Sequence, residues 1–296
     1  MIGDLAMTSW EAELLRIGVG TVLGLMAVGA ITRVFRRKPA LAGSAVPQPV
    51  VAPAPAPAIV PLSRPAPVNG WRVAAREVVN ADSRADKLVQ IDLEPTEGAA
   101  SWRAGASVEI ATAQGARRYP IASLPSEGHV RLWVPALEDP SAALAPSAVR
   151  LVADGAFRAP DGDAPVLMVG MGAGLAALRP NLMEMRAAGR KCWLIYGEHN
   201  PVTDGALCDE LIAWQEDGSL SRLDLTFYAG ADGRRVEDVF VGRTLEFRGW
   251  LGDDGAVLVS GPHDMAIAVD AALRRHMGDA WVESAIASGR YRRDIA

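Results

Sequence analysis

The stretch from residue 164 to residue 181, APVLMVGMGAGLAALRPN, constrains the fold of this chain most. An apolar run, Val166–Val169, leads directly into glycines at positions 170, 172 and 174, and an apolar-periodic segment follows. A strand buried on both faces of a parallel sheet favours such a continuous apolar run. Glycines let backbone N–H groups at the start of the next helix approach a phosphate closely. The stretch therefore predicts a strand, a tight turn and a helix that together can form a nucleotide site.

Downstream of this stretch the sequence alternates between strand-like and helix-like segments. Strands are predicted at Lys191–Tyr196, Arg222–Phe227 and Ala256–Ser260, and helices at Asp204–Glu216, Val236–Phe240 and Asp264–Met277. Such alternation implies right-handed crossovers, a parallel sheet and a ligand crevice at the carboxyl ends of the strands. Gly197 and Gly261 follow two of these strands directly, so the sequence places them at that crevice.

Upstream, short apolar alternations are separated by turn residues. They lie at Trp71–Val78, Leu88–Leu93, Ser107–Thr112, Tyr119–Ser123, His129–Val134 and Val149–Ala153. This spacing predicts a small antiparallel β-barrel ahead of the α/β parallel-sheet domain. Within it, residues 117–123 read RRYPIAS, and strand alternation puts Arg117, Tyr119 and Ile121 on one face.

The first 38 residues predict a transmembrane helix. Ile17–Ile31 carries no charge, and the basic cluster Arg36–Lys38 follows it. A span needs about 20 residues, so this run must be extended by snorkelling of the flanking arginines. The positive-inside rule then predicts a single-pass anchor in the inner (cytoplasmic) membrane, with the globular part in the cytoplasm. A buried core helix and a processed leader are the alternatives. Residues 39–69, rich in proline and alanine, predict a semi-rigid linker.

Charge and cysteine content limit the kinds of ligand and partner that the sequence predicts. Residues 39–296 hold 25 Lys and Arg against 32 Asp and Glu, a net charge of −7, which argues against a nucleic-acid partner. Cys192 and Cys208 lie in no C-x-x-C or histidine-rich setting, so no metal site is predicted. Both thiols are expected to pack as small apolar groups.

Five motifs follow one another in a characteristic order. They are R-x-Y-x-I-A-S at 117–123, P-V-L-M-V-G-x-G-x-G at 165–174, Gly197 with Asp204, S-G-P-x-x-M at 260–265 and G-R-Y-R-R-D-I at 289–295. This order resembles the reductase module of the ferredoxin–NADP reductase superfamily, and most of all its sulfite reductase flavoprotein and cytochrome P450 reductase branch. The likeness covers Trp71 to Ala296 and is divergent. It divides the chain into an anchor (1–38), a linker (39–69), an FAD-binding-type barrel (70–160) and an NAD(P)-binding-type α/β domain (161–296).

The resemblance implies FAD in the barrel and NADPH or NADH in the α/β domain, with hydride transfer where the two meet. Arg117 is then expected to face the FAD diphosphate, and Tyr119 to pack on the isoalloxazine. Ser260 replaces the cysteine that the family has beside the nicotinamide, so Tyr119 and Ser260 are the expected catalytic residues. The expected cofactor-binding residues are Arg117, Tyr119, Ile121, Ser123, Gly170, Gly172, Gly174, Gly197, Arg234, Gly261 and Met265.

The chain also departs from the family pattern. Pro120 replaces a hydroxyl residue beside the flavin and has no N–H to donate. The segment Pro140–Ala148 lacks the glycine and Ser/Thr turn that binds the FAD diphosphate in the family. The Ser-Arg pair that holds the NADP 2′-phosphate is replaced by Tyr228-Ala229, which leaves Arg234 as the basic residue in register.

Three functions remain after these departures. The leading one is a membrane-tethered, flavin-dependent NAD(P)H oxidoreductase that passes electrons to a separate membrane-associated redox subunit or flavodoxin-like acceptor protein. The alternative is a non-catalytic subunit that keeps the reductase fold as an interaction module in a membrane complex. A sensor that binds nucleotide without chemistry is a third possibility.

Overall fold

A computed structural model describes residues 70–112, 115–141, 144–153, 155–229 and 233–295. These residues belong to one compact unit. The predicted membrane anchor and proline-rich linker lie outside the described residues. Within the part of the chain that the structure describes, no helix is both long and apolar enough to cross a bilayer.

The first half of the described chain forms two three-stranded antiparallel sheets. Their strands are β1 (Trp71–Val78), β2 (Leu88–Pro95), β3 (Ser107–Thr112), β4 (Gly115–Pro120), β5 (Val130–Pro135) and β6 (Val149–Val152). The strand orders are β1-β2-β5 and β4-β3-β6. Apolar side chains on the inner faces, among them Ile91, Val108 and Leu132, form one core between the sheets. The predicted antiparallel barrel-like domain is therefore present as two packed sheets.

The fourth strand differs from its prediction. The sequence placed it at Tyr119–Ser123, whereas β4 begins at Gly115 and ends at Pro120. It begins early because residues 115–120 pair with β3 as a hairpin. Beyond Pro120 the chain turns toward β5, since the Ala122 N–H donates to the Arg131 carbonyl at 2.8 Å. This bond links the end of one sheet to the other.

The second half forms a five-stranded parallel sheet. Its strands are β7 (Val166–Met171), β8 (Cys192–Glu198), β9 (Arg222–Phe227), β10 (Ala256–Gly261) and β11 (Tyr291–Ile295), in the order β11-β10-β7-β8-β9. The helices are α2 (Leu175–Ala187), α3 (Cys208–Glu216), α4 (Thr244–Leu251), α5 (His263–Met277) and α6 (Asp279–Ala287). The segment predicted as a short helix at Val236–Phe240 is a 3₁₀ helix. The predicted alternation and parallel sheet are confirmed.

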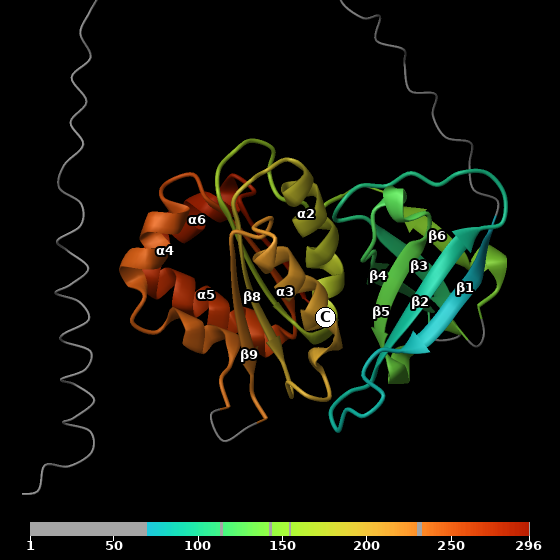
Figure 1. Cartoon of the computed structure of the whole chain (residues 1–296). Helices are drawn as coiled ribbons and strands as arrows, with labels where there is room; N and C mark the ends of the chain where they lie inside the picture. The colour runs from blue at the N-terminus through green and yellow to red at the C-terminus, as the bar shows by residue number, and fades with distance from the viewer. Residues whose placement is uncertain (1–69, 113–114, 142–143, 154, 230–232, 296) are drawn as a thin grey trace, which may run out of the picture. The chain divides into compact units, whose positions relative to one another are not determined.

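Helices cover both faces of this sheet. Residues of α2 and α3 share a core with Met168, Leu194 and Leu258 on one face of the sheet. On the opposite face, α4, α5 and α6 pack against the residues that flank these three in their strands (Figure 1). Both faces of β7 are therefore buried, which explains why its sequence is apolar at every position instead of alternating. Cys192 and Cys208 are buried in the first of these cores, as expected.

The antiparallel domain packs against α2. Leu88, Ala122 and Trp133 belong to the same apolar cluster as Leu178 and Leu182 of that helix. These residues extend the α/β core on the α2 side into the antiparallel domain, which also has a core of its own between its sheets.

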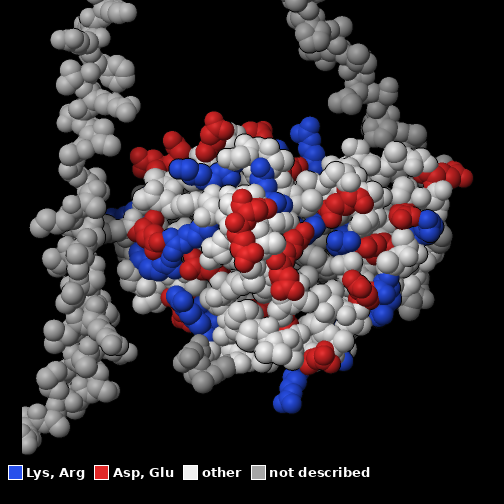
Figure 2. All heavy atoms as spheres, viewed as in Figure 1, with Lys and Arg blue, Asp and Glu red and all other residues white. Residues whose placement is uncertain are grey.

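Charged side chains of both signs are intermixed on the face that Figure 2 presents. Many belong to exposed ion pairs, such as Arg150 with Glu109 at 2.8 Å. Such exposed pairs contribute about 0–1 kcal/mol each, so the stability of the fold rests on its apolar cores.

Candidate functional site

A cavity of about 250 Å³ lies where the parallel strands end and the antiparallel domain begins. The α/β domain contributes Met171, Gly172, Ala173, Gly174, Glu198, His199, Asp204, Tyr228, Gly261 and Pro262 to its walls. The antiparallel domain contributes Asn80, Ala85, Asp86, Lys87, Leu88 and Pro135. The carboxyl ends of β7, β8, β9 and β10 thus converge on one cavity, which is where open α/β sheets bind ligands.

The glycine turn forms one wall of this cavity. Gly172–Gly174 make a short 3₁₀ turn that runs directly into α2, and no side chain caps the start of the helix. Gly172 has φ of +53° and open space where a side chain would begin. At Gly174, by contrast, a Cβ would lie 2.2 Å from the Ser260 carbonyl oxygen. Glycine is therefore required at Gly174 for close packing, and the turn leaves backbone N–H groups free for an anion.

A second cavity of about 190 Å³ lies beside the first. Its walls are Met171, Gly197, Thr226, Tyr228, Arg234, Arg235, Val236, Glu237, Asp264 and Met265. Met171 and Tyr228 line both cavities. The second cavity holds two cations, Arg234 and Arg235, and two carboxyls, Glu237 and Asp264.

Most of the site residues predicted in the α/β domain meet at these cavities. Gly172, Gly174 and Gly261 line the first, and Gly197, Arg234 and Met265 line the second. Two others lie elsewhere. Gly170 packs under α2, where a Cβ would meet Leu178 at 2.5 Å. Ser260 is buried in β10 and lines neither cavity, so the cofactor role of Gly170 and the catalytic role of Ser260 stay predictions.

The predicted flavin residues of the antiparallel domain are engaged with their own chain. The Arg117 guanidinium pairs with the Glu138 carboxylate at 3.0 Å. Tyr119 is only 6% exposed and belongs to the domain's core. Its hydroxyl donates to the Glu138 carbonyl at 3.3 Å, and burial raises the pKa of the phenol.

Ile121 and Ser123 are also buried. The Ser123 hydroxyl donates to the His129 carbonyl at 2.7 Å and accepts the Arg131 N–H at 2.9 Å. None of the four predicted flavin residues lines either cavity. Their cofactor roles stay predictions, because in this structure each side chain has a partner or a packing role of its own.

Sequence reasoning did not single out Glu198, although it lies in the first cavity. Burial, with a contribution from Asp204, raises the pKa of this carboxyl to about 7. One of its oxygens contacts the hydroxyl of Tyr196, which is wholly buried. A carboxylate directly after Gly197 at the end of a predicted strand was the available signal.

Asp204 also has a role that the sequence did not reveal. Asp204 is the first residue of the predicted helix Asp204–Glu216, but its side chain makes no cap hydrogen bond. It accepts instead from the Asn80 amide at 2.9 Å and the Thr203 hydroxyl at 2.9 Å. Burial alone raises its pKa, yet hydrogen bonds from Ser83, Asn80 and Thr203 outweigh burial and lower it. Asp204 is therefore an ionised link between the two domains at the cavity.

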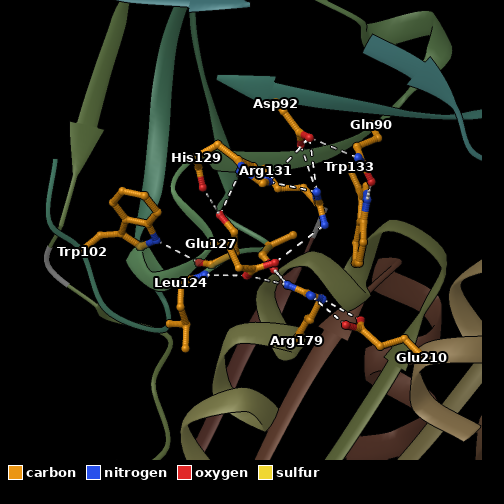
Figure 3. A network of polar contacts seen from close by, with 12 residues as sticks. Gln90, Asp92, Trp102, Leu124, Glu127, His129, Arg131, Trp133, Arg179 and Glu210 are labelled. Atoms are coloured by element: carbon orange, nitrogen blue, oxygen red, sulfur yellow. Dashed lines mark hydrogen bonds and ion pairs between the residues drawn. The ribbon is translucent and has the colours of Figure 1, made fainter. Parts of the chain in front are cut away.

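Arg179 of α2 forms a second link between the domains (Figure 3). Its guanidinium is buried and donates to both oxygens of Glu210 at 2.7 Å, to the Ala122 carbonyl at 2.8 Å and to Glu127 at 2.9 Å. Burial alone raises the pKa of Glu127, but the hydrogen bonds from Arg179 and from the Leu124 N–H lower it. This network fixes the antiparallel domain against α2 and so fixes the shape of the cavity.

Comparison with solved structures identifies the architecture. The chain superposes on ferredoxin–NADP⁺ reductase from Plasmodium falciparum with a TM-score of 0.61 and 13% identity, covering 76% of this chain and 95% of that one. The chain has a ferredoxin–NADP reductase-like fold. In this reductase-like fold, the cavity lies at the carboxyl ends of the parallel strands, where the alternation of strands and helices predicted a ligand crevice.

Curated relatives of the reductase-like chain are flavoproteins. It is 27% identical over 154 residues to the NADPH sulfite reductase flavoprotein alpha-component of Bacillus subtilis, matching 47% of this chain and 26% of that protein. It is 33% identical over 129 residues to the same component of Thiocapsa roseopersicina, matching 42% of this chain and 25% of that protein. The chain thus spans about a quarter of the length of these relatives. No family model matches it.

Proposed function

We propose that this chain is the reductase module of a flavin-dependent NAD(P)H oxidoreductase that passes electrons to a separate acceptor protein. The observation that carries the proposal is the cavity at the carboxyl ends of the parallel strands, with the glycine turn on one wall and the antiparallel domain on the other. The relatives that share its sequence are named as NADPH-dependent flavoproteins, which supports the same chemistry here.

The nicotinamide nucleotide fits the residues that are present. The turn Gly172–Gly174 is open toward the cavity, and its N–H groups suit a diphosphate. Arg234 and Arg235 in the adjoining cavity suit a further phosphate, such as the 2′-phosphate of NADPH. When bound, the nucleotide supplies a hydride. The chain's own residues bind and orient it and keep water from the reacting ring.

The expected flavin residues of the antiparallel domain have partners within the chain. Arg117, the expected diphosphate ligand, is paired with Glu138, and Tyr119 beside it is buried in the core. Both side chains of the Arg117–Glu138 pair are about half exposed, so flavin binding would exchange this ion pair for contacts to the cofactor. We therefore assign no step of the reaction to Arg117, Tyr119, Ile121 or Ser123.

This same observation favours a second function. A subunit that keeps the reductase fold without flavin would pair and bury these residues, since nothing would select for their exposure. We therefore retain a non-catalytic reductase-fold interaction module as the second candidate. A nucleotide site without a flavin site would suit such a subunit, whose binding to its complex then depends on NAD(P)H.

The electron acceptor and the cellular place of the chain belong to the proposal as well. The apolar run Ile17–Ile31 and the basic cluster that follows it support a tether in the inner membrane with the reductase module in the cytoplasm. A membrane redox subunit or a flavodoxin-like protein would then be the acceptor within reach of the tether.

Flavin content separates the two functions. Full-length protein purified in detergent is expected to bind FAD in about one-to-one ratio after reconstitution, with an absorbance band that NADPH bleaches under nitrogen. Protein that binds nucleotide, stays colourless after FAD reconstitution and leaves NADPH unoxidised identifies the non-catalytic subunit. Fractionation of cells that express the chain, with and without residues 1–38, tests the tether.

A further inference from the structure

Tyr196 lies between two hydrogen-bond acceptors in the interior of the α/β domain. Its hydroxyl oxygen is 3.0 Å from the Gly172 carbonyl oxygen and in hydrogen-bond contact with a carboxyl oxygen of Glu198. A phenol has one hydrogen and can donate only once. With a single hydrogen, the hydroxyl would face one of these two oxygens with no hydrogen between the two atoms. A second hydrogen is therefore needed to satisfy both contacts, and Glu198 is the group in position to carry it.

We propose that Glu198 is held as a neutral carboxylic acid that donates to the Tyr196 hydroxyl, which donates in turn to the Gly172 carbonyl, so that nucleotide binding at the glycine turn is linked to one proton on Glu198. The inference rests on the proposed function, because it assigns regulation to the same nucleotide site. Glu198 acts here as a positioning residue. It sets the turn through Tyr196 and has no reacting atom of its own.

Burial and the charge of Asp204 favour the neutral form of Glu198 and raise its pKa, whereas hydrogen bonds from the Tyr196 hydroxyl and the His199 backbone favour the carboxylate and lower it. Asp204, in the segment before α3, is ionised and lies in the same cavity. Tyr228 after β9 and Cys208 of α3 supply no positive charge, and Asp86 of the antiparallel domain lines the cavity too. The basic groups at this cavity are His199 and Lys87. The raised pKa of Glu198, about 7, is consistent with this balance.

Ionisation of Glu198 would act on the nucleotide in two ways. The carboxylate would take the single hydrogen of Tyr196, and the Gly172 carbonyl would lose its donor. A negative charge would also enter the cavity that receives the diphosphate, whose own charge repels it. Both effects weaken binding, so affinity is present below the pKa of Glu198 and falls as pH rises through about 7.

Binding of NAD⁺ to the full chain between pH 6 and pH 8 tests the proposal. NAD⁺ is the suitable probe because it has no group that titrates in this interval, unlike the 2′-phosphate of NADP⁺. We expect the wild-type dissociation constant to rise about tenfold from pH 6 to pH 8, as one required proton with a pKa of about 7 dictates. Glu198→Gln, which donates at any pH, is expected to abolish this dependence and keep the tight affinity.

Glu237→Gln is the matched control, because Glu237 is a carboxyl of the second cavity with no contact to Tyr196. It should keep the wild-type pH dependence. Tyr196→Phe should lower affinity at pH 6 toward the wild-type value at pH 8. A wild-type constant that is flat with pH, or a Glu198→Gln variant that retains the tenfold change, overturns the proposal.

Infrared difference spectra provide a readout without nucleotide. We expect a carbonyl band of a protonated carboxylic acid at pH 6 that is lost by pH 8 and is missing from Glu198→Gln. Its absence from the wild type overturns the proton assignment even if NAD⁺ binds. Its presence in a chain that binds neither NAD⁺ nor NADP⁺ at any pH supports the assignment and refutes the proposed function instead.

Discussion

The predicted cofactor residues line a cavity in one half of this molecule and have partners within the chain in the other half. In the α/β domain Gly172, Gly174 and Gly261 come together around one cavity. In the antiparallel domain the Arg117 guanidinium is paired with Glu138 and Tyr119 lies in the core. The α/β site is built mainly from backbone at strand ends, so it survives substitution of neighbouring side chains. The predicted flavin site depends on side chains instead, and those side chains have partners within the antiparallel domain.

The first prediction tests whether the two halves are one cooperative unit. Arg179→Ala removes the buried guanidinium that joins α2 to Ala122 and Glu127. We expect the free energy of unfolding to fall by about 3–5 kcal/mol, since the buried partner of Glu127 and Glu210 is lost and Glu127 keeps only the more distant Arg131, at 3.7 Å. Urea unfolding followed by tryptophan fluorescence measures this loss.

Arg72→Ala is the control for that experiment, because Arg72 pairs with Glu94 at the surface of the antiparallel domain. Its expected effect is about 0–1 kcal/mol. Equal losses in the two variants would show that Arg179 does not couple the domains.

The second prediction concerns the backbone character of the α/β site. Gly174→Ala places a methyl group 2.2 Å from the Ser260 carbonyl oxygen, so the turn must shift. We expect NAD⁺ affinity to fall about a hundredfold, or about 2.7 kcal/mol. Gly172→Ala enters open space and meets only the cost of a positive φ, about 1 kcal/mol. Calorimetric titration of both variants checks the ranking, and equal affinities would refute the close-packing argument.

The third prediction separates NADP from NAD. Arg234→Ala removes a cation from the second cavity. We expect about tenfold weaker NADP⁺ binding, the loss of one charge-assisted hydrogen bond, with NAD⁺ binding unchanged. Arg275→Ala, which removes an exposed cation of α5 outside both cavities, should alter neither affinity. If Arg234→Ala lowers NAD⁺ and NADP⁺ affinity equally, the 2′-phosphate does not bind near this side chain.

The last prediction concerns Arg117, whose guanidinium is paired with Glu138 in the antiparallel domain, and it has the smallest expected effect. Glu138→Gln releases Arg117 from an ion pair whose side chains are about half exposed. Such pairs contribute up to about 1 kcal/mol, so we expect FAD affinity to rise by about fivefold at most. Equilibrium dialysis against FAD measures it.

Glu109→Gln is the matched control for this variant, since it breaks the exposed Arg150 pair of the same domain. It should leave FAD binding unchanged. If neither the wild type nor Glu138→Gln retains FAD in dialysis, the contrast between the two halves stands and the non-catalytic function is favoured.

Several features of this protein were readable from residue order alone. The apolar run Val166–Val169 with the glycines after it predicted a buried strand, a turn and a helix, and the structure has them as β7, the 3₁₀ turn and α2. Alternating strands and helices predicted a parallel sheet, and the carboxyl ends of its strands line the cavity. These features are local or periodic, so a window of neighbouring residues contains the physics that decides them.

Tertiary structure decided the state of the individual side chains. Arg117 is neutralised by a residue 21 positions along the chain, and Arg179 by Glu127 and Glu210 on different elements. Glu198 has its raised pKa because burial and Asp204 surround it in the folded chain. Charge state and accessibility depend on what packs nearby, and the partners of Arg117 and Arg179 lie more than 20 positions away in sequence. The residue order therefore determined where a site forms, and only the folded packing determined which of its side chains remain available.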